Sequence, residues 1–467
     1  MQDKLLNYVI SDADMSATIR KCVDKDMPIA VLRELCHKEV RMGLAAELVD
    51  GTYQYETPHT AYIPKDEIDP VTKKRKMRRV IVHDTITRWL ASRTNDGLFK
   101  FCADMVHPAC TSYQKGMGTG KVVRRVVRAM RRMRLKNPHR IGFKADLSKY
   151  FDSVPREVIM RYLDKIDERL GGSVLTTWLR QVYNDDRLEV PVNENDDENE
   201  NHGKRETHVV MEYQSLKQGF AVASFLADAV LYHMDERLSA LRGVYVRYSD
   251  DVMFIGEDAE LAMLMMNEEL RAVGLTVNEK KVEWISEDTA VKFLGFSIHG
   301  EVISLSKGRL EKFVKEVRRR TLDRVRKMQI KRKKHGKPKP TAKGYKNLSR
   351  QCVASVNNWL YRGMGGHSWA SGCLGVITSE HDVHVMDEFV KDCIRAVAAG
   401  VWQHCGVGGI GYVPGRKDGV MERGTGIHMN KARKAMPGKV EGYKSMWALK
   451  RAIGDKPQYE YLVAQSA

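Results

Sequence analysis

The sequence predicts an α+β protein built on a split βαββαβ unit, an antiparallel sheet with helices on one face. Three observations support this fold class. From Arg140 onward, the apolar patterns indicate strand, helix, helix, strand-turn-strand, helix and strand. Apolar residues alternate on both sides of the polar pair Asp250-Asp251, as in a β-hairpin. Residues 1–50 and 305–400 instead show mainly helical spacing.

Composition points to a globular protein with a polyanionic partner. The 467 residues are enough for two to four domains, and the formal net charge is +18. Basic residues cluster at 73–79, 121–136 and 312–339, which favours nucleic acid as the partner. The alternative is a set of solvated basic faces. No apolar run is long enough for a bilayer and no signal-peptide pattern is present, so we expect a cytoplasmic protein without membrane contact.

The elements before the central sheet suggest a basic surface. Residues 1–50 are expected to be helical, followed by a hairpin of strands 62–65 and 78–82 and a helix at 84–98. Lys65 on this hairpin could lie over a triphosphate or touch only a nucleic-acid backbone. A glycine-rich loop, 112–121, leads into a helix at 122–135. One face of this helix is apolar, while Lys121, Arg124 and Arg128 suit a phosphate backbone.

The central elements place polar residues at strand ends and turns. A strand at 140–147 ends just past Asp146, and a helix follows Pro155. The acidic run 193–201 is expected to be a hairpin tip between the β-like stretches 187–192 and 207–213. Gln218 and Gly219, where the missing side chain permits close approach of another chain, precede one long helix at 224–241.

After the Asp250-Asp251 hairpin, we expect a helix at 259–273 and a hairpin strand at 293–298. A basic amphipathic helix at 307–330, which carries Arg318 and Arg326, should follow, and then a Lys/Gly/Pro linker at 331–346. Helices are expected at 348–361 and 385–401, and irregular structure at 406–441.

Three carboxylates form the candidate chemical centre. Asp146 at a strand end and Asp250-Asp251 at a hairpin tip should lie on neighbouring strands of one sheet. Such a set can hold two divalent ions about 3.5–4 Å apart, and oxygen ligands favour Mg²⁺, with Mn²⁺ as an alternative. A solvated Asp-Asp turn is the other interpretation of Asp250-Asp251.

Five motifs follow one another along the chain. They are Ala145-Asp146-Leu147-Ser148-Lys149-Tyr150-Phe151-Asp152, Gln218-Gly219 with Ser224, Tyr248-Ser249-Asp250-Asp251, Asn278 with Lys281, and Phe293-Leu294-Gly295-Phe296. In this order they resemble the reverse transcriptase family, over residues 55–400, and most resemble bacterial enzymes of retroelements or defence systems. Two positions depart from common family patterns. Ser249 stands where Ala or Met is usual, and Lys217 where intron-encoded relatives often have Pro.

The resemblance implies a right-hand polymerase with the metal ligands Asp146, Asp250 and Asp251, which are also its catalytic residues. It implies fingers at 51–139, a palm at 140–304 with an insertion at 185–215, and a helical thumb at 305–400. An N-terminal helical region, 1–50, and a basic Gly-rich extension, 401–467, would flank them.

The resemblance also assigns the remaining site residues. Lys65 and Arg78 would clasp the triphosphate, although Arg79 is an alternative register. Phe151 would exclude a 2′ hydroxyl or pack in the core beside Tyr150. Lys281 would lie near the triphosphate or be a surface lysine. Leu147 and Gln218 would complete the nucleotide site, while Gly219, Phe293 and Gly295 would contact nucleic acid.

The implied function is RNA-directed DNA synthesis from dNTPs, giving a cDNA product. Defence-associated relatives commonly copy a dedicated structured noncoding RNA, so the resemblance implies such a template and a role in antiphage defence. An oligomer is compatible with the sequence. Two alternatives stay open, namely an RNA-dependent RNA polymerase and an RNA-binding, maturase-like module of a retroelement.

Overall fold

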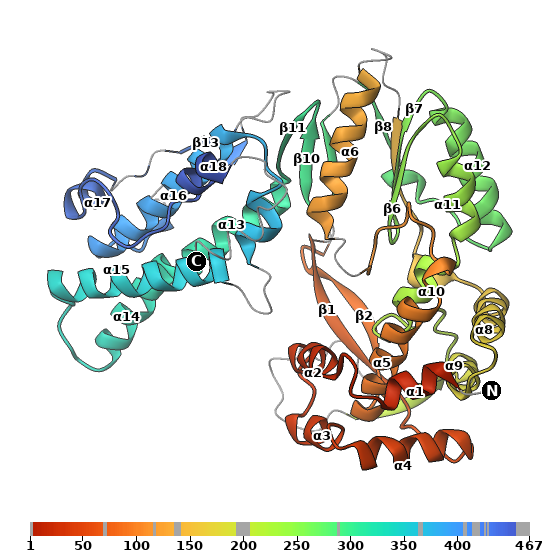
Figure 1. Cartoon of the computed structure of the whole chain (residues 1–467). Helices are drawn as coiled ribbons and strands as arrows, with labels where there is room; N and C mark the ends of the chain where they lie inside the picture. The colour runs from red at the N-terminus through yellow and green to blue at the C-terminus, as the bar shows by residue number, and fades with distance from the viewer. Residues whose placement is uncertain are drawn as a thin grey trace. The chain divides into compact units, whose positions relative to one another are not determined.

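The computed structural model describes residues 3–68, 72–114, 118–134, 142–192, 206–286, 290–362, 368–404, 409–412, 421–424, 426 and 429–453. The acidic run 193–201 and residues 115–117 of the glycine-rich loop lie outside these residues. The chain divides into two compact units (Figure 1). The first contains Met1–Gly116 and Gly142–Trp284, and the second Met117–Ile141 and Ile285–Ala467.

The first unit begins with the expected helical region. Its helices are α1 (Lys4–Ile10), α2 (Met15–Asp24), α3 (Ile29–Glu34) and α4 (Lys38–Val49), drawn in red in Figure 1. They are followed by α5 (Thr85–Phe101), whose first turn is capped by Asp84, and by the short η1 (Ala103–Met105). The buried guanidinium of Arg93 on α5 donates to carbonyls at the end of α1, including that of Val9 at 3.2 Å. Satisfying these terminal carbonyls ties α1 to α5.

A four-stranded sheet carries the predicted basic hairpin. The antiparallel pair β1 (His59–Ile68) and β2 (Arg75–Val82) confirms that hairpin, with longer strands than the sequence indicated. The strands β4 (Arg187–Pro191) and β5 (Thr207–Met211) extend the sheet in the order β2-β1-β4-β5.

A second four-stranded sheet has a split βαββαβ order, but its last strand is 283–285. The strand expected in that place, 293–298, lies in another sheet. The strands of the second sheet are β3 (Gly142–Asp146), β6 (Gly243–Tyr248), β7 (Asp251–Gly256) and β8 (Glu283–Ile285), arranged as β6-β7-β3-β8. Both β3 and β6 run antiparallel to β7. The intervening helices are α7 (Tyr150–Ser153), α8 (Arg156–Leu170), α9 (Val174–Asn184), α10 (Ala223–Ala229), α11 (Tyr232–Ser239), α12 (Ala259–Ala272) and η2 (Glu279–Lys281).

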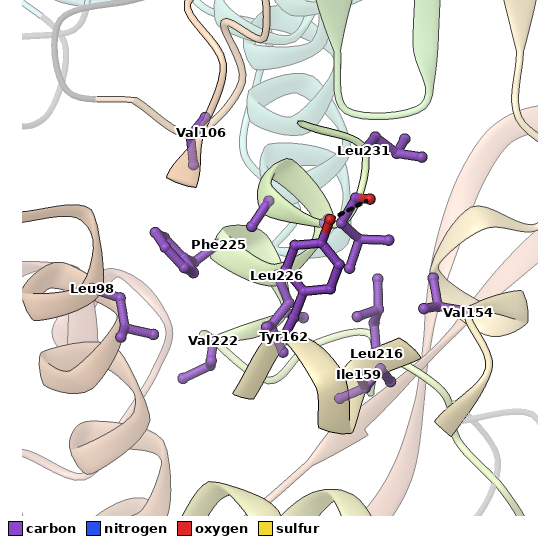
Figure 2. Close-up of a cluster of buried hydrophobic side chains, with 14 of the residues drawn as sticks. Leu98, Val106, Val154, Ile159, Tyr162, Leu216, Val222, Phe225, Leu226 and Leu231 are labelled. Atoms are coloured by element: carbon purple, nitrogen blue, oxygen red, sulfur yellow. Dashed lines mark hydrogen bonds between the residues drawn. The ribbon is translucent and has the colours of Figure 1, made fainter. Parts of the chain in front are cut away.

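The core of this unit joins helices α5, α8 and α10. Figure 2 shows Leu98, Ile159 and Phe225 among the apolar side chains gathered around Tyr162. Burying a side chain of this size removes enough apolar surface from water to contribute about 1.5–3 kcal/mol. This core fixes the helices on which the sheet rests.

The prediction of one long helix at 224–241 is wrong, because the chain breaks between α10 and α11. The break releases backbone carbonyls, and side chains from other elements satisfy them. The Tyr162 hydroxyl donates to the Val230 carbonyl at 3.2 Å, and the Arg247 guanidinium donates to the Asp228 carbonyl at 2.8 Å. Hydrogen bonds from distant side chains thus replace the helical hydrogen bonds. A local sequence pattern cannot reveal this replacement.

The second unit combines a small sheet with basic helices. The helix α6 (Thr119–Arg134) confirms the prediction for 122–135. The strands β9 (Val291–Phe293), β10 (Phe296–His299) and β11 (Val302–Leu305) form a sheet in the order β11-β10-β9, which contains the predicted hairpin. The remaining elements are α13 (Lys307–Arg320), α14 (Leu322–Lys334), α15 (Ala342–Asn357), η3 (Asn358–Arg362), η4 (Ala370–Leu374), α16 (Glu380–Ala398), β12 (Ile410–Tyr412), β13 (Met421–Arg423), α17 (Met429–Ala435) and α18 (Met446–Ile453).

Three predictions for this unit need correction. The continuous helix expected at 307–330 is broken at the fully buried Thr321, whose hydroxyl donates to the Val317 carbonyl at 2.6 Å. The linker expected at 331–346 shrinks to 335–341 because α14 and α15 extend into it. The stretch 406–441, expected to be irregular, contains β12, β13 and α17. Across the described residues, every helix is too short or too polar to traverse a lipid bilayer.

Candidate active site

The backbone brings the three predicted carboxylates to one edge of the β6-β7-β3-β8 sheet. Asp146 ends β3 and is paired directly with Asp251, the first residue of β7. Tyr248 is also paired with Asp251, so Ser249 and Asp250 form a two-residue hairpin loop. The Leu147 N–H donates to the Asp250 carbonyl at 3.1 Å, which ties this loop to the strand that carries Asp146.

The loop depends on an unusual residue conformation. Ser249 has a φ of +59°, in the left-handed region that non-glycine residues rarely occupy. Its N–H donates to the Ser112 Oγ at 2.9 Å, and its hydroxyl lies 3.2 Å from that of Tyr113. The Ser112 hydroxyl in turn donates to Asp228 at 2.5 Å. The first residues of the glycine-rich loop therefore hold the turn that presents Asp250 and Asp251.

A buried ion pair supports the same turn from within the core. Arg247 and Asp235 both have fully buried side chains, and the Arg247 Nη2 lies 2.6 Å from the Asp235 Oδ2. The guanidinium also donates to the Ser249 carbonyl at 3.2 Å. Removing one partner of such a buried pair typically costs about 3–5 kcal/mol, because the other charge is left without compensation. The pair therefore stabilises the fold and the position of the loop together.

The hydrogen bonds and the ion pair that support the turn were not predicted from the sequence. Burial raises the pKa of Asp228 to about 6, and among the described groups its Oδ2 has no hydrogen-bond partner. Two signals were present: Asp228 and Asp235 lie seven residues apart, on the same face of a helical stretch, and Arg247 interrupts an apolar strand. Both place charges on faces that should be buried.

Burial and mutual repulsion make the carboxylates costly to ionise together. Burial raises the pKa of Asp250, the charge of Asp146 raises it further, and Lys281 and Arg78 oppose these effects. Burial likewise raises the pKa of Asp251 to about 6, with Lys144 lowering it and the other two carboxylates raising it. A cation at this edge would relieve that cost.

Two lysines provide positive charge at the carboxylates. The Lys281 Nζ lies 2.8 Å from the Asp146 Oδ2, and the Lys144 Nζ lies 3.9 Å from the Asp251 Oδ1. Lys281 was predicted to lie near the site, whereas Lys144 was missed although it precedes Asp146 by two residues on the same strand.

A metal ion is compatible with the chemistry of these donors. In the described part of the chain, no three Asp, Glu, His or Cys side chains are arranged as a metal site. The edge nevertheless offers three carboxylates on paired strands, a hard oxygen set that suits Mg²⁺ or Mn²⁺. An ion bound through Asp146 would replace the contact between its carboxylate and Lys281.

The basic hairpin supplies two exposed cations to the same unit. Lys65 lies on β1 and Arg78 on β2. Burial raises the pKa of Asp152, next to Phe151, and four cations oppose it: Arg79 most, then Lys149, Lys65 and Arg78. Arg79 is instead held by Glu212 in a bidentate pair of 2.8 and 2.7 Å. Arg79 is thus engaged by a carboxylate while Arg78 is exposed, and contact of either with a triphosphate stays a prediction.

Phe151, Gln218 and Gly219 lie in this unit as well. Phe151 is half-buried, with its ring edge-on to that of Tyr150 at 5.7 Å. The Gln218 carbonyl accepts from the Ile81 N–H at 2.7 Å. Gly219 has a φ of +111°, and a Cβ there would lie 2.6 Å from the Ile81 carbonyl oxygen. The close approach expected for Gly219 is therefore to β2 of the same chain.

The other predicted nucleic-acid contacts belong to the second unit. Lys121 and Arg128 are exposed on α6, while Arg124 donates to the Gly375 carbonyl at 3.0 Å. Phe293 is buried, and Gly295, with a φ of +80°, occupies the turn between β9 and β10. The remaining residues lie on the basic helices, Arg318 on α13 and Arg326 on α14. Their contact with nucleic acid stays a prediction.

Comparison with known proteins gives one family and several distant structures. The family model described as "Reverse transcriptase (RNA-dependent DNA polymerase)" matches residues 63–298. No curated protein matches the chain.

The solved structures with similarity include telomerases and a viral polymerase. A truncated apo telomerase from Candida tropicalis is 14% identical, with 53% of this chain and 55% of that chain covered and a TM-score of 0.37. A Candida albicans telomerase in complex with a telomeric RNA fragment is 12% identical, with 73% and 62% covered and a TM-score of 0.36. The RNA-dependent RNA polymerase of a human picobirnavirus is 15% identical, with 66% and 58% covered and a TM-score of 0.38.

These alignments cover little more than half of each matched telomerase or polymerase chain. At such TM-scores they say nothing about the template or product of this protein. The family match, in contrast, extends over half of the 467 residues and includes the basic hairpin, the central sheet and all three carboxylates. The right-hand polymerase fold expected from the motifs agrees with this sheet. The chain therefore belongs to the reverse transcriptase family.

Proposed function

We propose that the protein is an RNA-directed DNA polymerase that transfers deoxynucleotides to a 3′ hydroxyl. The observation that carries the proposal is the pairing of Asp146 with Asp251, beside Asp250 in the hairpin loop. Three carboxylates fixed by two paired strands form a platform of negative charge with little side-chain freedom. This is the arrangement that nucleotidyl transfer with two divalent ions requires.

The residues around the platform have separable roles. Two Mg²⁺ ions, held by Asp146, Asp250 and Asp251, would activate the 3′ hydroxyl and stabilise the leaving pyrophosphate. Lys65 and Arg78 bind the triphosphate by charge-assisted hydrogen bonds. Lys281 approaches the same phosphates once its ammonium leaves Asp146. The Gln218-Gly219 segment, tied to β2, supports the incoming nucleotide, and the buried Leu147 contributes its backbone.

Phe151 favours deoxynucleotides over ribonucleotides. Its ring is anchored by Tyr150 yet remains partly exposed, so it can occupy the space that a 2′ hydroxyl would need. This feature supports the DNA polymerase over the alternative, an RNA-dependent RNA polymerase.

The template is proposed to be a dedicated structured noncoding RNA, held by basic surfaces outside the catalytic centre. The exposed cations of α6 and α14 support this part, since phosphate contacts supply sequence-independent affinity for RNA. The biological setting that follows from the resemblance, antiphage defence, is proposed with it.

Primer extension with the purified protein tests the enzymatic activity. An RNA template with an annealed DNA primer, four dNTPs and Mg²⁺ should give templated DNA, and the Asp250→Asn, Asp251→Asn double variant should lose the activity by at least about 10³-fold. The Asp104→Asn, Asp164→Asn double variant is the matched control, because it removes the same charge from exposed positions. Equal extension by wild type and the Asp250/Asp251 variant would refute the assignment.

The same variant separates the enzyme from an RNA-binding, maturase-like module. A module that uses its polymerase motifs only as a scaffold would keep its biological activity after both changes. If the protein acts as a polymerase, the double variant should lose its biological activity while it remains folded, as judged by thermal unfolding.

A further inference from the structure

A pocket in the second unit combines positive charge with an aromatic ring. It has a volume of about 460 Å³, within the ~300–1,000 Å³ typical of small-molecule sites. Its apolar lining comes from Ile330, Pro340 and Trp402. Its charged lining is formed by Arg326, Arg332, Lys333, Lys337 and Lys339, and none of the lining residues that the structure describes is acidic.

Several hydrogen bonds fix the walls of this pocket. The Gln329 side chain of α14 donates to the Tyr345 hydroxyl at 2.8 Å and to the Gly400 carbonyl at 3.2 Å, which joins three segments of the chain. The Arg332 Nε donates to the Pro338 carbonyl at 2.7 Å, and the Lys337 N–H donates to the Arg332 carbonyl at 2.9 Å. The turn that carries Lys337 and Lys339 is thus pinned to α14.

The aromatic ring is held at the pocket while part of it stays accessible. Trp402 is half-buried, and the Arg326 guanidinium lies 5.5 Å from the centre of its ring. This cation–π contact adds positive charge beside an apolar surface. A ligand that matches both features must be anionic and must carry a flat apolar group.

A larger cavity beside α13 does not offer the same chemistry. It measures about 680 Å³, but Glu311 and Asp323 line it together with Lys315 and Arg318. Two carboxylates there would repel a polyanion, whereas the Trp402 pocket contributes only positive charge.

We propose that the Trp402 pocket binds one unpaired nucleotide of the RNA partner. The base stacks on Trp402, and the flanking phosphates lie against Arg332, Lys333 and Lys337. Single-stranded RNA fits because its bases are free to leave the strand and stack on aromatic side chains, whereas duplex RNA keeps its bases paired. This inference rests on the proposed function for the identity of the nucleic acid as RNA.

Fluorescence anisotropy of the full chain with a labelled U12 RNA oligonucleotide tests the pocket. Trp402→Ala should weaken binding by about tenfold or more, and Trp402→Phe, which keeps a stacking surface, should restore most of it. Equal affinities of wild type and Trp402→Ala would overturn the proposal. So would an equal loss with blunt duplex RNA as the probe, since stacking requires an unpaired base.

The charged residues are tested by salt dependence. The Lys333→Ala, Lys337→Ala double variant should reduce the slope of log affinity against log salt by about 1.4, since each phosphate contact on a single strand contributes about 0.7. The control, Lys343→Ala with Lys346→Ala, removes two exposed lysines of α15 that lie outside the pocket lining and should change the slope less. Equal slopes for the two double variants would contradict the assignment.

Two further measurements separate this proposal from the proposed function. A labelled T12 DNA oligonucleotide that bound more tightly than U12 would overturn the choice of RNA. If wild type extended a primer but Trp402→Ala bound U12 normally, the pocket would fail and the polymerase would stand. If Trp402→Ala lost U12 binding but wild type made no DNA, the polymerase would fail and the pocket would stand.

Discussion

At the scale of single residues, Asp228 links the core to the catalytic turn. Its carboxylate accepts from Ser112, which in turn accepts from the Ser249 N–H, yet its Oδ2 is buried with no hydrogen-bond partner among the described groups. An ionised carboxylate in this position is costly, and this cost is the reason that burial raises its pKa to about 6.

We predict that Asp228→Asn stabilises the protein more at pH 8 than at pH 4. The pKa of Asp228 in the folded chain lies above its ordinary value of 3.8. The protonated carboxyl group therefore stabilises the fold fully below about pH 4, and this stabilisation is lost as the pH rises through 6. The shift corresponds to about 3 kcal/mol at most. Asparagine can still accept from Ser112 and carries no charge. Thermal unfolding at both pH values should show a Tm gain of about 2–6 °C at pH 8 and a clearly smaller gain at pH 4. An equal Tm difference at both values would contradict this explanation.

Phe151 provides a second test at this scale. Phe151→Ala should let the enzyme incorporate ribonucleotides, because it removes the ring proposed to exclude a 2′ hydroxyl. The measurement is the ratio of kcat/KM for dNTP and NTP on one template, and we expect this ratio to fall by about tenfold or more. If Phe151 only packs beside Tyr150, the variant will lose stability while the ratio stays the same.

Individual site residues were predictable where a local pattern marked them. Asp146 and Asp250-Asp251 stand at a strand end and a hairpin tip, and the structure pairs them as expected. Lys144, Ser112 and Asp228 were not predicted, because their positions depend on cross-strand register and on contacts more than 100 residues apart in the chain. No local pattern reports such contacts.

At the scale of elements, the hairpin of β1 and β2 is tied to the segment that follows β5. The Ile81 N–H donates to the Gln218 carbonyl, and Gly219 lies so close to β2 that a side chain would meet its backbone. This contact sets where the exposed cations Lys65 and Arg78 lie in the first unit.

We predict that Gly219→Ala destabilises the protein by about 2–4 kcal/mol, because a Cβ would lie 2.6 Å from the Ile81 oxygen at a φ of +111°. Gly43→Ala is the matched control. Gly43 lies within α4, and the position that a Cβ would take there has no atom within 4 Å, so alanine should be neutral or stabilise by up to about 1 kcal/mol. Thermal unfolding and kcat/KM of both variants provide the test. Equal Tm values would show that the close approach to Ile81 does not constrain the fold.

Apolar spacing along the sequence did not predict where two of the helices break. The helices expected at 224–241 and 307–330 are each broken into two, although their apolar spacing continues across the breaks. At the first break, hydroxyl and guanidinium groups from distant residues take over the backbone carbonyls. At the second, the buried Thr321 hydroxyl takes the Val317 carbonyl. The sequence predicted which faces are buried but not where the helical hydrogen bonds stop.

At the scale of the whole molecule, the residues proposed for catalysis and those proposed for RNA binding lie mainly in different units. The first contains the three carboxylates, the two cations proposed to bind the triphosphate and the residue proposed to select the sugar. The second contains the exposed cations of α6 and α14 and the Trp402 pocket. With a net charge of +18 on the whole chain, affinity for RNA should fall steeply with salt.

The proposed activity of the whole chain is to copy RNA into DNA. The most direct measurement is to purify the full chain with its bound RNA, add four dNTPs and Mg²⁺, and sequence both the RNA and the newly made DNA. We expect DNA complementary to a discrete bound RNA species, and no such DNA from the Asp250→Asn, Asp251→Asn variant. DNA unrelated to the bound RNA, or a product made only from ribonucleotides, would contradict it.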